Sequence, residues 1–214
     1  MSSDILRLLT SPPPGRERIY GVVVGIVTDN KDPEDLYRVK IRFPWLDDPN
    51  ESRWARVASS MAGDQRGSYF LPEVGDEVLV AFEHGAIDFP YVVGSLWNGK
   101  DKPPESNSDG QNKHRTLHSR SGHVIRFVDT SGGERIEVID KTGNNSVVID
   151  SAKNTITMKS QSDITITSAT GRLKMSAVGI DIESKADIKI KANATIDAQA
   201  SAIMTLKGAM IKLN

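Results

Sequence analysis

The sequence predicts an all-β chain in two parts, a small closed barrel followed by an intertwined homotrimeric β-helix. Two observations predict this fold class. Between residues 20 and 99, five apolar strand candidates alternate with polar turns. From Val147 to Asn214, pairs of apolar residues separated by a single residue recur about every eight residues, and small polar residues fill the gaps.

The composition excludes several kinds of protein. The 214 residues include no cysteine, so a disulfide framework and a thiolate metal site are both excluded. The net charge is −1, with 11 Lys and Arg against 15 Asp and Glu in the first hundred residues, so nothing predicts a dedicated nucleic-acid binder. Because no apolar run is long enough for a membrane span or a signal peptide, we expect assembly in the cytoplasm.

Residues 1–19 are interpreted as an anchoring segment that docks on a partner. They carry the apolar cluster Ile5, Leu6, Leu8 and Leu9, followed by the stiff run Pro12–Pro14. A frayed terminus is the alternative for this segment.

Residues 20–99 are predicted to fold as an OB-type barrel, because five short strands in about 80 residues are typical of that fold. Pro72 and Gly75 are expected to shape the loop before a strand, and Gly94 to mark either a bulge or a close backbone contact. The expected strands are Tyr20–Thr28, Leu36–Phe43, Arg53–Ser59, Glu77–Glu83 and Phe89–Leu96.

An OB barrel can also bind oligonucleotides through aromatic platforms in a positive groove. The candidate platforms are Tyr37, Phe43, Trp45 and Trp54, and the candidate phosphate ligands are Arg38, Lys40, Arg42, Arg53 and Arg56. The acidic residues Asp47, Asp48 and Glu51 lie beside these arginines in the sequence. A barrel core with surface ion pairs is therefore the preferred interpretation of these residues.

Four stretches of the barrel resemble a known family. They are residues 39–45 (VKIRFPW), 54–58 (WARVA), 67–82 (GSYFLPEVGDEVLVAF) and 90–99 (PYVVGSLWNG). In this order they resemble the OB domain of VgrG-type spike proteins and of phage baseplate assembly protein V. The resemblance implies a central spike of a contractile injection system.

The polar residues 100–115 are expected to be a linker, and residues 116–146 resemble the neck at which three chains of such spikes begin to wrap. The spacing of His114, His118 and His123 could serve a metal site. His114 and His118 would share one face of a strand but lie well apart. We therefore prefer to interpret the three histidines as packed or solvated side chains. A catalytic site is not expected at Ser119, Ser121 and His123, because no further residue nearby in the sequence completes a nucleophile-and-base arrangement. We therefore expect no enzyme activity, metal or cofactor.

Residues 147–214 are predicted to form the trimeric β-helix. One short strand offers only two large apolar side chains, too few to offset the ordering of its backbone. Three chains are the smallest number that encloses such strands and gives each strand edge a partner. The expected trimer core is Ile156, Met158, Ile164, Ile166, Leu173, Met175, Ile180, Ile182, Ile188, Ile190, Ile196, Met204 and Leu206.

The resemblance also implies partners. No histidine follows His123, so the iron site that some phage tips carry in their last residues is missing. A PAAR-type tip protein is therefore expected to dock on Met210, Ile211, Leu213 and Asn214. A separate baseplate hub protein is expected to receive the anchoring segment, and inner-tube proteins and effector cargo are further candidates.

The expected function is a rigid spike of a phage-tail-like particle that touches the target membrane transiently while piercing it, with no nucleic acid bound. The alternative is an oligosaccharide- or nucleic-acid-binding OB module on a trimeric, adhesin-like fibre stalk.

Overall fold

The computed structural model describes residues 18–46 and 51–212. The hub-docking candidates Ile5, Leu6, Leu8 and Leu9, the acidic pair Asp47 and Asp48, and the tip candidates Leu213 and Asn214 lie outside these residues. The chain divides into two compact units, Met1–Gln161 and Ser162–Asn214. Within the described residues, regular structure is β-strand apart from one short 3-10 helix, η1 (Glu83–Gly85), and no helix could cross a bilayer.

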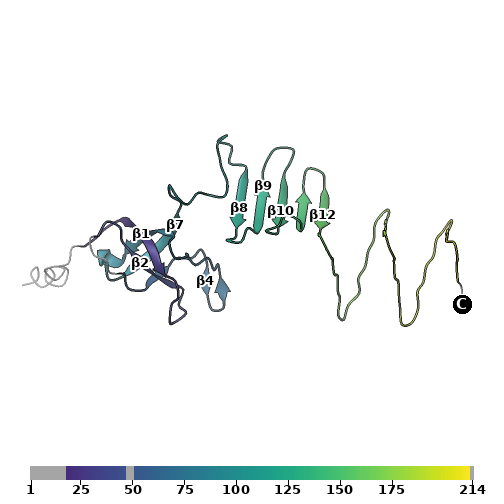
Figure 1. Cartoon of the computed structure of the whole chain (residues 1–214), viewed down its shortest axis with the longest axis horizontal. Helices are drawn as coiled ribbons and strands as arrows, with labels where there is room; N and C mark the ends of the chain where they lie inside the picture. The colour runs from purple at the N-terminus through teal and green to yellow at the C-terminus, as the bar shows by residue number, and fades with distance from the viewer. Residues whose placement is uncertain (1–17, 47–50, 213–214) are drawn as a thin grey trace, which may run out of the picture. The chain divides into compact units, whose positions relative to one another are not determined.

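The first unit begins with a closed five-stranded barrel in the order β1-β2-β3-β7-β6 (Figure 1). Each barrel strand falls inside or within one residue of an expected strand, so the barrel prediction is confirmed. Its strands are β1 (Val22–Asp29), β2 (Arg38–Arg42), β3 (Ala55–Val57), β6 (Glu77–Phe82) and β7 (Pro90–Leu96).

Alternation of side chains along the strands builds the barrel core. In β6, Val78, Val80 and Phe82 are buried and the residues between them face outward. In β2, Val39 and Ile41 point inward in the same way. Each such side chain contributes about 1.5–3 kcal/mol when fully buried.

Two glycines are required by the barrel. A Cβ on Gly25 of β1 would collide with the side chain of Ile41, so only glycine allows β1 and β2 to pack at this point. Gly75 has a φ of 98°, as expected for the loop before β6. The β6–β7 register shifts between Leu79 and Val80, opposite Gly94, and this bulge confirms the expectation for Gly94.

A short hairpin was not predicted. The strands β4 (Ala62–Gly63) and β5 (Arg66–Gly67) pair with each other within the segment that the sequence assigns to a loop. Two-residue strands of small and charged residues carry no periodic signal, so the pattern could not reveal them.

The first unit continues into a five-stranded antiparallel sheet in the order β12-β11-β10-β9-β8. The sheet runs on to Lys159 and thus includes two strands from the range expected to form the β-helix. Its strands are β8 (His114–His118), β9 (Val124–Val128), β10 (Arg135–Ile139), β11 (Ser146–Asp150) and β12 (Thr155–Lys159).

The second unit is an extended chain whose bends follow the sequence repeat. Its legs alternate in direction (Figure 1), and up to Lys212 none of them forms a hydrogen-bonded ladder within the single chain. The spacing of the apolar pairs departs from a strict eight residues near Gly171 and Gly179; Gly171 lies in one bend and Gly179 directly follows another. The bends lie at 161–162, 169–171, 178, 185–186, 193–194, 201–202 and 209.

Candidate self-association surface

One face of the β8–β12 sheet is a continuous apolar surface. The antiparallel registers align side chains of neighbouring strands into two rows that cross the sheet. The first row is Leu117, Ile125, Val138, Val147 and Met158, and the second is Arg115, Phe127, Ile136, Ile149 and Ile156. Every apolar member is at least 36% exposed. Monomeric proteins rarely leave so large an apolar patch uncovered, so this face needs a partner.

The opposite face of the same sheet is mainly polar, and an ion-pair network crosses its centre. Arg126 of β9 lies between Glu105 of the linker, 2.7 Å from its Nη2, and Glu137 of β10, 3.3 Å from its Nη1. Arg135 donates from Nε to the other oxygen of Glu137 at 2.6 Å. Glu137 is buried, so this network satisfies a charge that would otherwise be costly. The sheet therefore has one polar face and one apolar face.

Glu105 fixes the linker against this polar face. Its carboxylate accepts a hydrogen bond from Thr116 Oγ1 at 2.9 Å and lies 3.1 Å from His114 Nδ1. Partial burial raises the pKa of Glu105, but the hydrogen bonds from His114, Thr116 and Arg126 outweigh it and hold the pKa below its ordinary value. The linker is thus held at this point of the sheet by a charged contact.

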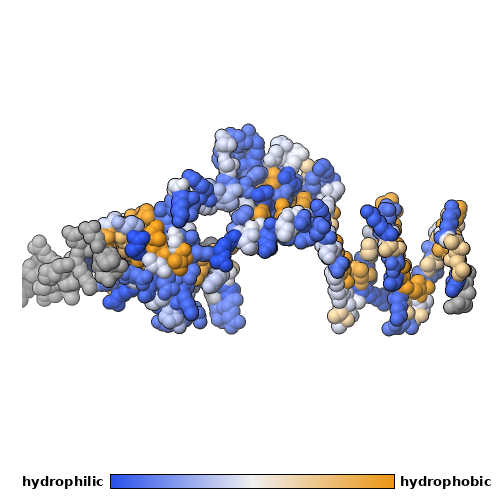
Figure 2. Space-filling model, in the orientation of Figure 1, coloured by the Kyte–Doolittle hydropathy of each residue, from blue (hydrophilic) through white to orange (hydrophobic). Residues whose placement is uncertain are grey.

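The apolar stripe of the second unit is exposed throughout the single chain. The expected core residues between 164 and 206 are 50–74% exposed, and Figure 2 shows hydrophobic residues at the surface of this segment. The tip candidates Met210 and Ile211 are also exposed. Val178, which lies at a bend, and Ile203 are more exposed than any of these, and the pairwise pattern does not include them.

The total accessible surface agrees with these local observations. The chain exposes 18363 Å². A compact monomer of 23.4 kDa is expected to expose roughly 9700 Å². The chain therefore leaves uncovered an excess of roughly 8700 Å² relative to that scaling.

The histidine and serine candidates do not form a reactive site. His114 and His118 lie at opposite ends of β8, and His123 accepts at Nδ1 from the backbone N–H of Lys141. Ser119 Oγ accepts from the backbone N–H of His123, which closes a turn and leaves the imidazole directed elsewhere. Within residues 18–46 and 51–212, no three His, Asp or Glu side chains are placed to hold a metal ion.

The aromatic platforms proposed for the barrel do not form one surface. Phe43 is 4% exposed and packs in the core against Phe82, with ring centroids 5.5 Å apart. Tyr37 instead packs against Tyr69. Phe43 therefore belongs to the barrel core, in agreement with the preferred interpretation, and its alternation with Val39 and Ile41 of β2 is the signal for its inward position.

Ion pairs account for several of the candidate phosphate ligands. Arg38 binds the nearly buried Asp32 at 2.6 Å, and Lys40 binds Glu51 at 3.2 Å. The Arg38 guanidinium holds the pKa of Asp32 well below its usual range, with help from backbone N–H donors of the same turn.

Comparison with known proteins identifies the barrel. Residues 23–97 match the family described as the type VI secretion system/phage-baseplate injector OB domain. The chain is 32% identical over 137 residues to the type VI secretion system spike protein VgrG3 of Vibrio cholerae serotype O1, covering 58% of this chain and 13% of that protein. It is 34% identical over 138 residues to spike protein VgrG5 of Pseudomonas aeruginosa, covering 58% and 17%.

A third relative is the actin cross-linking toxin VgrG1 of Vibrio cholerae serotype O1, 35% identical over 107 residues, or 46% of this chain and 10% of the toxin. The chain thus spans less than a fifth of the length of these three relatives. The similarity to VgrG3 and VgrG5 covers more of the chain than the barrel alone. Residues 23–97 therefore match the injector OB-domain family, and the chain is similar over more than half of its length to VgrG-type spike proteins.

Proposed function

We propose that this chain is the central spike subunit of a contractile injection system or contractile phage tail, and that it works as a homotrimer. The observation that carries the proposal is an injector-type OB barrel followed by an eight-residue strand repeat whose apolar side chains are exposed in the single chain. The function is mechanical: a stiff rod transmits the force of contraction to the target membrane and pierces it.

The trimer follows from the need to cover the apolar face and the strand edges together. Two chains could bury their apolar faces against each other, but the edges of the extended legs would keep unpaired N–H and C=O groups. Three chains wound about one axis enclose the stripe and place each leg beside legs of the other chains. The polar face of the β8–β12 sheet, with its Arg126 network, would then face solvent.

The partners of this spike are part of the proposal. The barrel and residues 1–19 would attach to a baseplate hub protein, and Met210 to Asn214 would receive a PAAR-type tip protein. Inner-tube proteins and effector cargo are further partners in such a particle. The spike itself would need no catalytic group or cofactor, because a stiff rod transmits force without any chemical reaction.

The mass of the chain in solution tests the trimer. Light scattering after size exclusion should give about 70 kDa, three times the 23.4 kDa of one chain. A mass of one chain at micromolar concentration would refute the braided rod. Immunogold labelling of purified contractile particles should then place this subunit at the baseplate centre, and label found only on the sheath would refute the role as a spike.

A further inference from the structure

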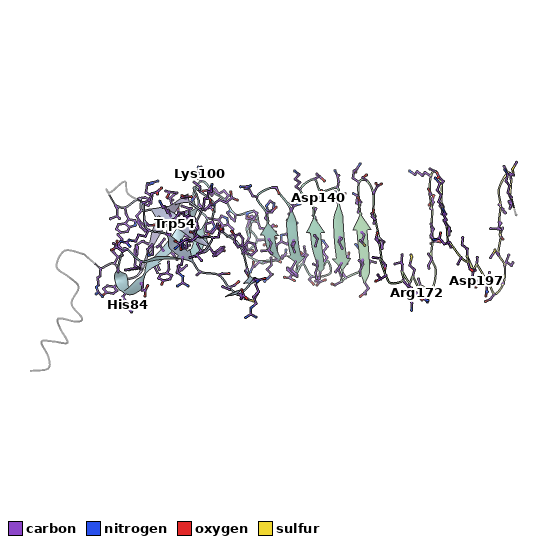
Figure 3. The ribbon with its side chains drawn as sticks, turned by 90° about the horizontal axis from the view of Figure 1, so that it is seen from below. Trp54, His84, Lys100, Asp140, Arg172 and Asp197 are labelled. Carbon is purple, nitrogen blue, oxygen red and sulfur yellow. The ribbon has the colours of Figure 1, made fainter. Side chains whose placement is uncertain are left out.

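A groove of about 530 Å³ lies on the outer side of the barrel, and the self-association surface does not use it. It is lined by outward-facing residues of β2, β3 and β7 and by the loops beside them. Trp54, labelled on the barrel in Figure 3, and Tyr91 form aromatic parts of its wall. Phe89, 55% exposed, adds an apolar surface. The groove thus combines apolar walls with charged side chains.

The barrel register places two arginines opposite each other in this groove. Arg38 of β2 pairs with Arg56 of β3, and Arg56 pairs in turn with Tyr91 of β7. Like charges directly opposite each other destabilise a sheet unless something neutralises them. Arg38 is neutralised by Asp32. Arg56 has no carboxylate within ion-pair distance among the described residues, so its charge remains available to an anion.

The two aromatic rings are already covered by cations. Lys40 Nζ lies 5.4 Å from the Trp54 ring centroid, and the guanidinium of Arg38 lies 6.0 Å from it. Arg56 lies 5.7 Å from the Tyr91 ring, while the Tyr91 hydroxyl donates to Glu83 at 3.0 Å. Each ring is therefore engaged by at least one cation, and this contact competes with the stacking of nucleobases that single-stranded nucleic-acid binding uses.

The closed barrel also excludes strand addition at this groove. β3 is bonded to β2 on one side and to β7 on the other, so the floor of the groove has no free strand edge. An occupant must be held by side chains.

The distribution of charge around the groove favours a short acidic occupant over a long one. The groove is lined by four Lys and Arg side chains against two carboxylates. Residues 20–99 as a whole contain 7 Lys and Arg against 13 Asp and Glu. A long polyanion that extends beyond the groove would meet this acidic surface and be repelled, whereas a short acidic segment would contact only the cationic groove.

We propose that the groove around Arg56 and Trp54 is a docking site for a short acidic segment of a partner polypeptide, with carboxylates that flank an apolar residue. One carboxylate pairs with Arg56, which has no ion-pair partner among the described residues, and the apolar residue packs on Phe89. The site belongs to the barrel and does not depend on the trimer.

Fluorine NMR of the full-length chain labelled with 5-fluorotryptophan tests this proposal. The sequence has 3 tryptophans, and Trp54→Phe assigns the reporter in the groove. The probe is the blocked peptide Glu-Glu-Leu-Glu-Glu, compared with Gln-Gln-Leu-Gln-Gln and with a thymidine oligonucleotide. The acidic peptide should shift the Trp54 resonance saturably at physiological salt and leave the Trp97 resonance in place.

Two variants show which charge is responsible. Arg56→Gln should weaken binding of the acidic peptide about tenfold, the worth of one hydrogen bond to a charged group. Arg66→Gln removes an equal charge from the β4–β5 hairpin, outside the groove lining, and should change the affinity by no more than about twofold, because salt screens distant charges. Equal weakening by both variants, no shift of Trp54, or a shift with the oligonucleotide alone would each overturn the proposal.

Discussion

A carboxylate placed in the apolar stripe should prevent assembly of the rod. Ile166 is 68% exposed in the single chain. If assembly covers that surface, each chain loses about 1–2 kcal/mol of burial when the isoleucine is replaced. Three buried carboxylates at one level of the rod add a desolvation cost of several kcal/mol each. For Ile166→Asp the sum is on the order of 10 kcal/mol per trimer, enough to weaken association about 10⁷-fold.

Thr165→Asp is the matched control, because it adds the same charge at the adjacent residue, which alternation places on the opposite face. Sedimentation equilibrium at micromolar concentration should find Ile166→Asp near 23.4 kDa and Thr165→Asp at about three times that mass. Acidification to pH 4 should partly restore the Ile166→Asp trimer, because burial favours the neutral acid. If both variants assemble equally well, the inward assignment of the stripe is refuted.

Three further predictions concern the first unit. Phe43→Ala should lower the free energy of unfolding of the barrel by about 3–5 kcal/mol in urea titrations, because it leaves a cavity in the core. Gly25→Val should lower the same free energy by about 1–3 kcal/mol, because the new side chain overpacks against Ile41. No loss of stability in either variant would contradict the core assignment. The depressed pKa of Asp32 stabilises the fold above its unfolded-state pKa of 3.8, and this contribution is lost as the pH falls below that value. Asp32→Asn should therefore lower the melting temperature at pH 7 and flatten its fall in acid, and an unchanged acid limb would count against the Asp32 ion pair. The pKa of Glu105 is lowered in the same direction, so its charge also stabilises the fold at neutral pH. Glu105→Gln should therefore speed hydrogen exchange in β8 at neutral pH, but much less below about pH 4. An equal increase of the exchange rate at both pH values would show that the charge of Glu105 does not hold the linker.

The barrel could be predicted from the sequence because its strands follow simple alternation. Val78, Val80 and Phe82 alternate with outward residues, and the strand that they predict appears as β6. The same rule applied strictly to β2 would have placed Phe43 inside with Val39 and Ile41, since they share one face. The platform interpretation of Phe43 rests on its aromatic chemistry alone, whereas its position in the alternation supports the preferred interpretation as a core residue.

Other features depend on contacts between residues that are distant in the sequence. Glu105 meets Arg126 across 21 positions, and no local pattern connects a linker carboxylate with an arginine of β9. Arg56 meets Tyr91 because β3 and β7 pair in parallel, which only the closed barrel determines. The eight-residue repeat was visible because it is local, and the bends of the second unit follow it.

The spacing of those bends has a consequence for how such a needle can change. In the proposed trimeric rod each module repeats the same short length of chain, so whole modules could be removed or duplicated without altering which residues face the proposed axis. The length of the proposed rod could then be adjusted in steps of one module, by evolution or by design. Its cross-section and the docking segments proposed for its two ends would stay unchanged.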